Sequence, residues 1–151
     1  MRTFAIIILC LIASVTTYAG TISPAVKGGI SYNWVDDSLQ TWAYVGAGLY
    51  ISPPLMPVGF YGDAGLSFKG KDQDIRLIAG VHLRTIPMFK IGVGGGLHSL
   101  KLADTTSTAI ALNGDAIFAP PIIPVFVELD IDYVFRATHK LQLLLLAGYR
   151  F

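Results

Sequence analysis

Three histidines and one neighbouring serine are the residues of this sequence best suited to chemistry. His98 and Ser99 are adjacent, and a serine beside a histidine can act as a nucleophile with its general base. Successive side chains of a strand point to opposite faces, so these two cannot share a proton within a strand. His82 is expected to face inward and His139 to lie in a loop. The sequence therefore predicts no catalytic residue, no cofactor and no metal site.

Residues 91–98, with the sequence IGVGGGLH, superficially suggest a phosphate-binding loop. The spacing is not GxGxxG, and no strand-to-helix junction is expected there. Gly92, Gly94 and Gly96 share the inward face of a predicted strand, where they leave room for large interior side chains or allow sharp curvature. The run therefore predicts a packing role rather than nucleotide binding.

Ten charged residues lie on one face of the predicted strands, and the large apolar side chains lie on the other face. The cations are Lys27, Arg76, Arg84, Lys90 and Arg150, and the anions are Asp63, Asp115, Glu128, Asp130 and Asp132. Charges that are removed from water must be paired to offset their desolvation. We therefore expect these ten to form one ion-paired network that fills an interior. A narrow polar pore remains the alternative.

Eight segments of about ten residues would position these side chains, because apolar residues recur in them with a period of two. They span residues 26–34, 41–51, 58–69, 75–84, 89–98, 109–118, 125–135 and 141–151. Along seven of them no outward position holds an ionisable residue, and a Lys or Arg facing lipid at mid-membrane would cost about 2 to 4 kcal/mol. Segment 41–51 is ambiguous, because its odd positions are aliphatic while its even positions include Trp42, Tyr44 and Tyr50.

The composition is that of a membrane protein without a membrane helix. Of 151 residues 53% are hydrophobic and 14% charged, and mean hydropathy is +0.59. Only helices and closed barrels satisfy every backbone polar group in lipid, and no apolar run after residue 20 is long enough for a helix. The sequence therefore predicts an all-β fold, an eight-stranded antiparallel up-and-down transmembrane barrel whose last strand pairs with its first. A soluble barrel would invert the pattern, with charges outside.

Residues 1–19 have the layout of a secretory signal peptide, and residues 20–151 would form the barrel. Arg2 precedes an apolar run over residues 4–13, and cleavage is expected after Ala19. A membrane anchor would need nearer twenty apolar residues. Cys10 is the only cysteine and lies inside this segment, so the mature chain would have neither a disulfide nor a cysteine nucleophile. The net charge of +1 also argues against a nucleic-acid partner.

A signal peptide, eight alternating strands and a final strand ending on Phe151 together resemble the small OmpA/OmpX-type outer-membrane barrels of Gram-negative bacteria. The resemblance is architectural and matches no specific member. It implies a monomer in the bacterial outer membrane, with outer-membrane lipids as partners and periplasmic chaperones during biogenesis. It also implies that the barrel-assembly machinery reads the C-terminal signal formed by Leu145, Ala147, Tyr149 and Phe151.

The connections between predicted strands alternate in character. Those after the second, fourth and sixth strands contain SPPLMP, TIPM and APPIIP, whereas the others are polar or charged and short. In barrels of this type the amino terminus begins in the periplasm, so the proline-rich turns would be periplasmic. Two aromatic girdles are expected: Trp34, Trp42, Tyr44, Tyr133 and Phe135 near the outer interface, and Phe60, Phe89, Phe118, Tyr149 and Phe151 near the inner one.

These patterns favour an integral outer-membrane protein with a side-chain-filled polar lumen and a structural or envelope role. Short extracellular loops weaken the case for an adhesin. One alternative is a narrow porin-like conduit for small solutes. A further alternative is an outer-membrane lipid-modifying enzyme, although the chain has no His-x-Ser motif of the lipid A deacylase kind.

Overall fold

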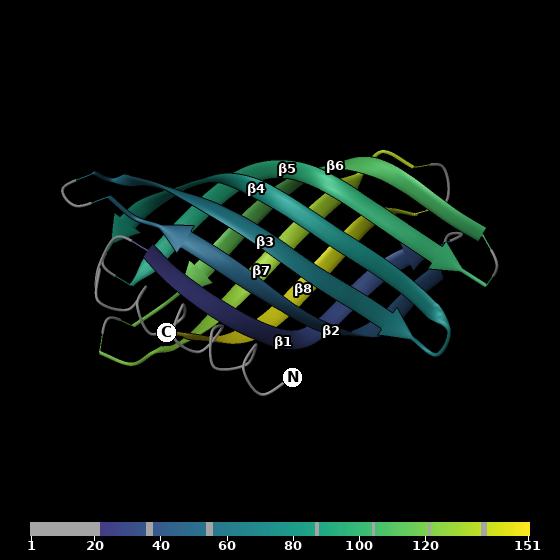
Figure 1. Cartoon of the computed structure of the whole chain (residues 1–151), viewed down its shortest axis with the longest axis horizontal. Coiled ribbons are helices and arrows are strands. Elements are labelled where there is room, and N and C mark those ends of the chain that lie inside the picture. Colours follow the sequence, from purple (N-terminus) through teal and green to yellow (C-terminus); the bar gives the residue numbers. More distant parts are fainter. Residues whose placement is uncertain are drawn as a thin grey trace, which may run out of the picture.

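The computed structural model describes residues 22–35, 38–53, 56–86, 88–103, 105–120, 122–136 and 139–151. Its strands are β1(Ile22–Val35), β2(Ser38–Ile51), β3(Val58–Lys69), β4(Asp72–Ile86), β5(Phe89–Leu102), β6(Thr105–Phe118), β7(Val125–Val134) and β8(His139–Arg150). They follow one another in chain order around a closed antiparallel barrel (Figure 1). The predicted fold class is therefore confirmed. The predicted signal peptide lies outside the described residues.

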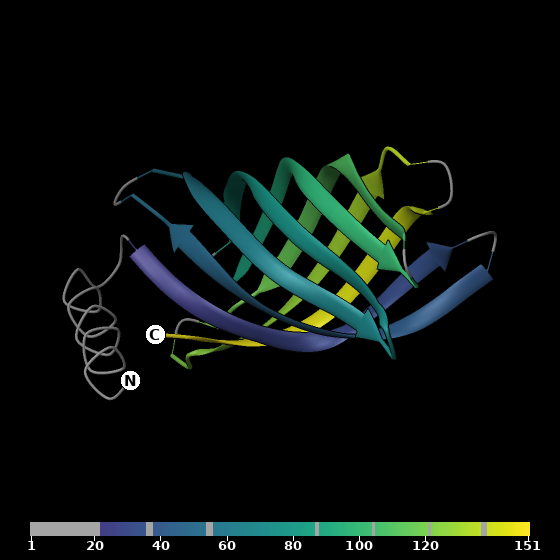
Figure 2. The ribbon, with the colours of Figure 1, turned by 45° about the vertical axis from the view of Figure 1, so that its right-hand side comes forward.

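The strands contain 10 to 15 residues and are mostly longer than the predicted segments, because pairing continues to the ends of the hairpins. The β3–β4 ladder, for example, ends at Lys69↔Asp72, so only residues 70–71 join the two strands. Gly70 has a φ of 63°, a left-handed conformation that suits glycine in a two-residue hairpin. Figure 2 shows that the strands are strongly tilted relative to the barrel axis. Within the described ranges, no helix combines the length and apolar character needed to cross a membrane.

The barrel closes between β1 and β8. Val26 pairs with Tyr149 and Ile30 with Leu145, and the backbone N–H of Phe151 donates to the carbonyl of Pro24 at 2.9 Å. β1 begins and β8 ends at the same end of the barrel, called here the terminal end, where β2, β4 and β6 also end and β3, β5 and β7 begin. The opposite end is called the loop end. The C-terminal residue is thus part of the wall, as predicted.

Apolar side chains cover the outside of the barrel and charged side chains lie inside it. β7 shows this most clearly: its outward residues are 40% to 47% exposed, and its inward residues are at most 3% exposed. The outward residues are Val125, Val127, Leu129, Ile131 and Tyr133, and the inward ones are Phe126, Glu128, Asp130, Asp132 and Val134. This is the arrangement of a membrane barrel and the reverse of a soluble one.

β2 resolves the ambiguous segment 41–51. Trp42, Tyr44 and Tyr50 face inward and are at most 3% exposed, whereas Val45 and Leu49 lie on the outer wall. The prediction that Trp42 and Tyr44 belong to the outer aromatic girdle is therefore wrong. The physical reason is that their polar groups find partners inside: the hydroxyl of Tyr44 donates to Asp63 at 3.0 Å, and the indole N–H of Trp42 to Gln40 at 3.3 Å.

The other girdle aromatics face outward. Trp34, Tyr133 and Phe135 are exposed near the loop end, and five more are exposed near the terminal end: Phe60, Phe89, Phe118, Tyr149 and Phe151. Several of these rings pack on each other, as in the pair formed by Phe89 and Phe118, whose centroids are 4.9 Å apart. Exposed aromatic rings at both ends of an apolar wall are typical of the two membrane interfaces.

Candidate functional site

Arg76 on β4 lies at the centre of the charged interior. Its Nη1 is 2.8 Å from a carboxylate oxygen of Asp130 and 3.4 Å from one of Asp63, and its Nε is 2.7 Å from Asp132. These three carboxylates come from β3 and β7. A guanidinium can serve several acceptors at once, because it presents five N–H donors in a fixed plane. Arg76 therefore ties β4 across the lumen to both of those strands.

Lys27 on β1 forms the second node of this interior. Its Nζ is 2.9 Å from Oε2 of Glu128, and it also contacts the carboxylate of Asp63. Tyr50 donates a hydrogen bond of 3.1 Å to Glu128. Asp63 thus receives Lys27, Arg76 and the hydroxyl of Tyr44 together. Because Asp63 and Glu128 are each held by at least one cation, part of the desolvation penalty of burying them is offset.

His98 and Asp74 extend the network towards the loop end. Nδ1 of His98 lies 2.8 Å from Asp74, and Nε2 lies 3.3 Å from Asp132. Asn113 donates to the same Asp132 at 2.7 Å. The sequence does not predict this role of His98, and it places Asp74 in the connection before the predicted strand 75–84. The missing signal was parity, because Asp74 stands two residues before Arg76 on β4 and shares its inward face.

The structure brings together six of the ten charged residues predicted to form the lumen network. These six are Lys27, Asp63, Arg76, Glu128, Asp130 and Asp132. Asp115 is buried on β6 opposite Asp130 but forms no ion pair within 4.0 Å among the described residues. Arg84, Lys90 and Arg150 lie apart from the network, at the terminal end.

A neutral polar layer lies between the ion network and the loop end. The side-chain amide of Gln142 donates to Ser31 at 2.8 Å, to Asn33 at 2.8 Å and to Ser67 at 3.0 Å, and all four side chains are at most 1% exposed. Beyond this layer Trp42 packs on Leu100. At the terminal end Tyr50 packs edge-on against Phe126, with centroids 6.0 Å apart. The lumen is therefore occupied by side chains along its length.

The structure also brings together a serine and a histidine that are 30 residues apart. Oγ of Ser52 and Nε2 of His82 are 3.3 Å apart, and both residues are buried. The sequence does not predict this serine–histidine contact. Nδ1 of His82 is buried without a hydrogen-bond partner among the described residues, so no carboxylate orients the ring as in a catalytic triad. By contrast, Ser99 bonds to Thr108 away from the buried His98, as strand geometry predicts.

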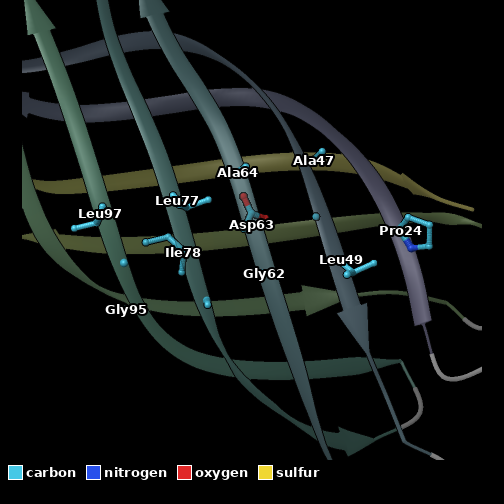
Figure 3. A pocket seen from close by; sticks show the side chains of 13 residues that line it. Pro24, Ala47, Leu49, Gly62, Asp63, Ala64, Leu77, Ile78, Gly95 and Leu97 are labelled. Atoms are coloured by element: carbon cyan, nitrogen blue, oxygen red, sulfur yellow. The ribbon is translucent and has the colours of Figure 1, made fainter. Parts of the chain in front are cut away.

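A groove of about 730 Å³ crosses the outside of the wall formed by β1 to β5 (Figure 3). A row of small residues forms its floor, in which Gly62 pairs with Ala79 and Ala79 with Gly95. Larger side chains such as Leu77 and Leu97 border it. The outward side chains along it are apolar, so it suits hydrocarbon. Asp63 also lines it, but this carboxylate faces the lumen and is held by Lys27 and Arg76. Among the described residues there is also no group of three side chains able to hold a metal ion.

Comparison with known proteins places this architecture among outer-membrane barrels. No protein-family model matches the chain, and no curated protein matches it in sequence. Neisserial surface protein A, NspA, covers 85% of this chain and 95% of its own at 14% identity, with a TM-score of 0.65. Ail of Yersinia pestis, solved in complex with the heparin analogue sucrose octasulfate, covers 87% and 99% at 15% identity, with a TM-score of 0.59.

A de novo designed transmembrane β-barrel is also similar, covering 87% of this chain and 96% of its own at 14% identity, with a TM-score of 0.55. At these identities the likeness shows the fold alone. The chain has the closed eight-stranded antiparallel fold of the small outer-membrane barrels, in agreement with the resemblance drawn from its sequence.

Proposed function

We propose that this protein is an integral outer-membrane barrel that does not conduct and that has a structural or envelope role. The observation that carries this proposal is the ion network inside the barrel. Lys27 and Arg76 join carboxylates of β3 and β7 across the lumen, and every member is at most 5% exposed. An eight-stranded barrel is only wide enough for its side chains to fill it, so no continuous water path is expected.

The energetics of the network support a permanently closed lumen. Opening a path would separate Arg76 from its carboxylates or Lys27 from Glu128. Removing one partner from a buried ion pair costs about 3 to 5 kcal/mol, because the other charge is left without compensation. A narrow conduit for small solutes would need this separation during every opening, which makes it the less favoured alternative.

The loop end gives little support to a role in binding other cells. Residues 70–71 alone join β3 to β4, and β7 and β8 are joined by residues 135–138. Hairpins of this length leave few side chains beyond the barrel rim. The complex of Ail with sucrose octasulfate is a property of Ail, and these short connections do not favour the same activity here.

A lipid-acting enzyme is the third candidate, and the contact between Ser52 and His82 is the observation that favours it. The burial of both groups argues against it, as does Nδ1 of His82, which has no hydrogen-bond partner among the described residues. Incubation with labelled lipid A or phospholipid is expected to release no acyl chain. Release that disappears in Ser52→Ala and His82→Ala would establish the enzyme instead.

Biogenesis follows from the same proposal. We infer that residues 1–19 direct export and are removed, and that chaperones and the barrel-assembly machinery deliver a monomer to the outer membrane with its termini in the periplasm. The proposed C-terminal signal is supported by the common face of Leu145, Tyr149 and Phe151, which are 45% to 50% exposed on the outer wall. Compact migration of unboiled protein from outer membranes, and slower migration after boiling, would test this localisation.

Conductance in a planar lipid bilayer tests the closed lumen directly. The refolded full-length barrel is expected to give no steady current steps, because the ion network blocks the path between the two ends. A general porin in the same bilayer serves as the positive control. Reproducible single-channel steps from this protein would overturn the proposal and favour the conduit.

A further inference from the structure

Three cations lie at the terminal end of the barrel, outside the ion pairs that the described residues form. Arg84 on β4 and Lys90 on β5 are directly paired across the two strands, and Arg150 is the last residue of β8. None of the ion pairs within 4.0 Å that the described residues form includes any of the three. We call these three residues the cationic mouth. Like charges placed directly opposite on neighbouring strands destabilise a sheet, so this arrangement calls for an anion.

The two arginines are held in place by neutral groups. Nη2 of Arg84 donates to the carbonyl of Ser52 at 3.4 Å, and Nη2 of Arg150 donates to the carbonyl of Pro120 at 3.2 Å. Backbone carbonyls orient a guanidinium but do not neutralise it. Each arginine has five N–H donors, and these bonds use few of them. Nη2 of Arg150 also donates to the carbonyl of Ile123 at 3.4 Å and its Nε is buried, so the donors left for a ligand are the remaining Nη groups.

Lys90 lies between the two arginines and the interior. Its Nζ is 5.6 Å from the centre of the Tyr50 ring, and it lines a small crevice with Arg150 and Phe126. This crevice measures about 10 Å³, so it accommodates a water molecule at most. A ligand would therefore lie on the mouth and not inside the lumen.

Among the described residues, the carboxylates deeper in the lumen form no ion pair within 4.0 Å with these cations, although Asp115 and Glu128 attract Lys90 at longer range. Glu128 is held by Lys27 and by the hydroxyl of Tyr50. Asp115 lies next to Asp130 on the neighbouring strand and forms no ion pair within 4.0 Å in the described part of the chain. Arg84 is exposed, and Lys90 and Arg150 are half-buried, so all three can be reached from the aqueous side.

We propose that the cationic mouth binds a phosphoryl group, borne either by a lipid headgroup or by a free phosphate. Arginine forks match the paired oxygens of a phosphate, and lysine adds a compact point charge. Three cations around one opening suit an anion that carries up to two negative charges. The opening lies where the wall of the barrel ends, next to the exposed rings of Phe89 and Phe118, which places it at the depth of headgroups.

Ligand-dependent stability of the full chain provides the test. The refolded barrel is unfolded with urea in uncharged maltoside micelles, with chloride replaced stepwise by inorganic phosphate at constant ionic strength. At a phosphate concentration ten times its dissociation constant, the apparent unfolding constant is expected to fall about tenfold. A parallel arm adds phosphatidylglycerol to the micelles in place of free phosphate, with diacylglycerol as the uncharged lipid control.

Variants that remove one positive charge, either at the cationic mouth or at the loop end, locate the site. Lys90→Gln and Arg84→Gln are expected to lose the stabilisation by phosphate or phosphatidylglycerol. Lys71→Gln and Lys101→Gln remove exposed cations at the loop end and are expected to keep it. If the first two variants do not refold, the second measurement is the broadening of the phosphate ³¹P resonance by wild-type protein. This broadening is expected to persist with Lys71→Gln and to be reversed when pyrophosphate is added as a competitor.

Each outcome decides the proposal. Stabilisation by inorganic phosphate supports a site for free phosphate, and stabilisation by phosphatidylglycerol alone supports a headgroup site. No stabilisation in either arm overturns the proposal. An equal effect in wild type and Lys90→Gln also overturns it, because the anion would then act elsewhere on the barrel.

Discussion

Arg76 shows how one residue can organise an interior. Its guanidinium faces Asp63, Asp130 and Asp132, and it is 2% exposed. No other cation in the described part of the chain forms ion pairs with three carboxylates. The fold therefore depends on the shape of this side chain as well as on its charge.

Arg76→Leu is expected to lower the free energy of unfolding by about 3 kcal/mol or more, because three carboxylates would face one another without their cation. Arg76→Lys should give an intermediate loss, since a lysine keeps the charge but not the planar fork. Urea unfolding in micelles, followed by the change in gel mobility, measures both. Equal stability of wild type and Arg76→Leu would show that the network does not hold the barrel together.

Strand parity alone predicts which charged side chains face inward. Lys27, Arg76 and Glu128 alternate with apolar neighbours in the sequence, and each is at most 5% exposed. The contact between Ser52 and His82 could not be predicted, because it joins the residue that follows β2 to a residue of β4, 30 residues later in the chain. Arg84 has inward parity but lies at the end of its strand, where parity no longer separates interior from solvent.

At the scale of the element, β3 carries two glycines with opposite surroundings. A Cβ added to Gly65 would meet the ring and hydroxyl of Tyr44, which is buried and bonded to Asp63. A Cβ added to Gly62 would meet nothing within 4 Å, because that residue faces the outer groove. The two positions are three residues apart on the same strand, which makes them a matched pair.

Gly65→Ala is expected to destabilise the barrel by about 1 to 3 kcal/mol, the usual cost of overpacking an interior. Gly62→Ala should be neutral or slightly stabilising, because glycine weakens a strand interior and the added methyl group has space. Equilibrium unfolding of the two variants side by side provides the comparison. A larger loss in Gly62→Ala would contradict the assignment of inner and outer faces on β3.

Phe151, directly after the end of β8, joins the chain to the wall of the barrel. Deleting Phe151 removes the bond from its N–H to the carbonyl of Pro24 and the ring contact with Tyr149, whose centroid is 5.2 Å away. The amount of heat-modifiable barrel in outer membranes is expected to fall. Phe151→Tyr is the control that keeps both the bond and an aromatic ring. Unchanged yield and mobility after the deletion would rule out an assembly role for the terminal aromatic.

The boundaries of the elements were less predictable than their existence. Segment 41–51 had two plausible faces, because aromatic rings suit both a membrane interface and a filled lumen. The hydrogen-bond partners decide the face: Asp63 on β3 for Tyr44, and Gln40 on the same strand for Trp42. Asp74 is predicted to lie in a connection for a related reason, since charged residues near a turn are normally solvent-exposed. In the structure the β3–β4 ladder continues to the pair Lys69↔Asp72, so Asp74 lies within the strand.

At the scale of the whole molecule, the barrel has the reverse polarity of a soluble protein, with polar side chains inside and apolar side chains outside. Ion pairs and amides fill the interior, and aliphatic and aromatic groups are exposed. The partition was predictable from a period of two and from the cost of placing a charge in lipid. The division of the interior into a paired network and an unpaired cationic mouth was not, because it depends on which strands face each other across the lumen.

The order of the strands has a consequence for how the chain folds. Seven of the eight strand pairs join neighbours in the sequence, and only β1 and β8 bring the two extremes of the chain together. Hairpins form from local contacts and are fast, whereas a contact of high sequence separation must first overcome the entropy of closing a long loop. We therefore expect the pairing of β1 with β8 to form last during folding and to open first during unfolding. A covalent cross-link between these two strands would stabilise the folded barrel more than a cross-link within any hairpin.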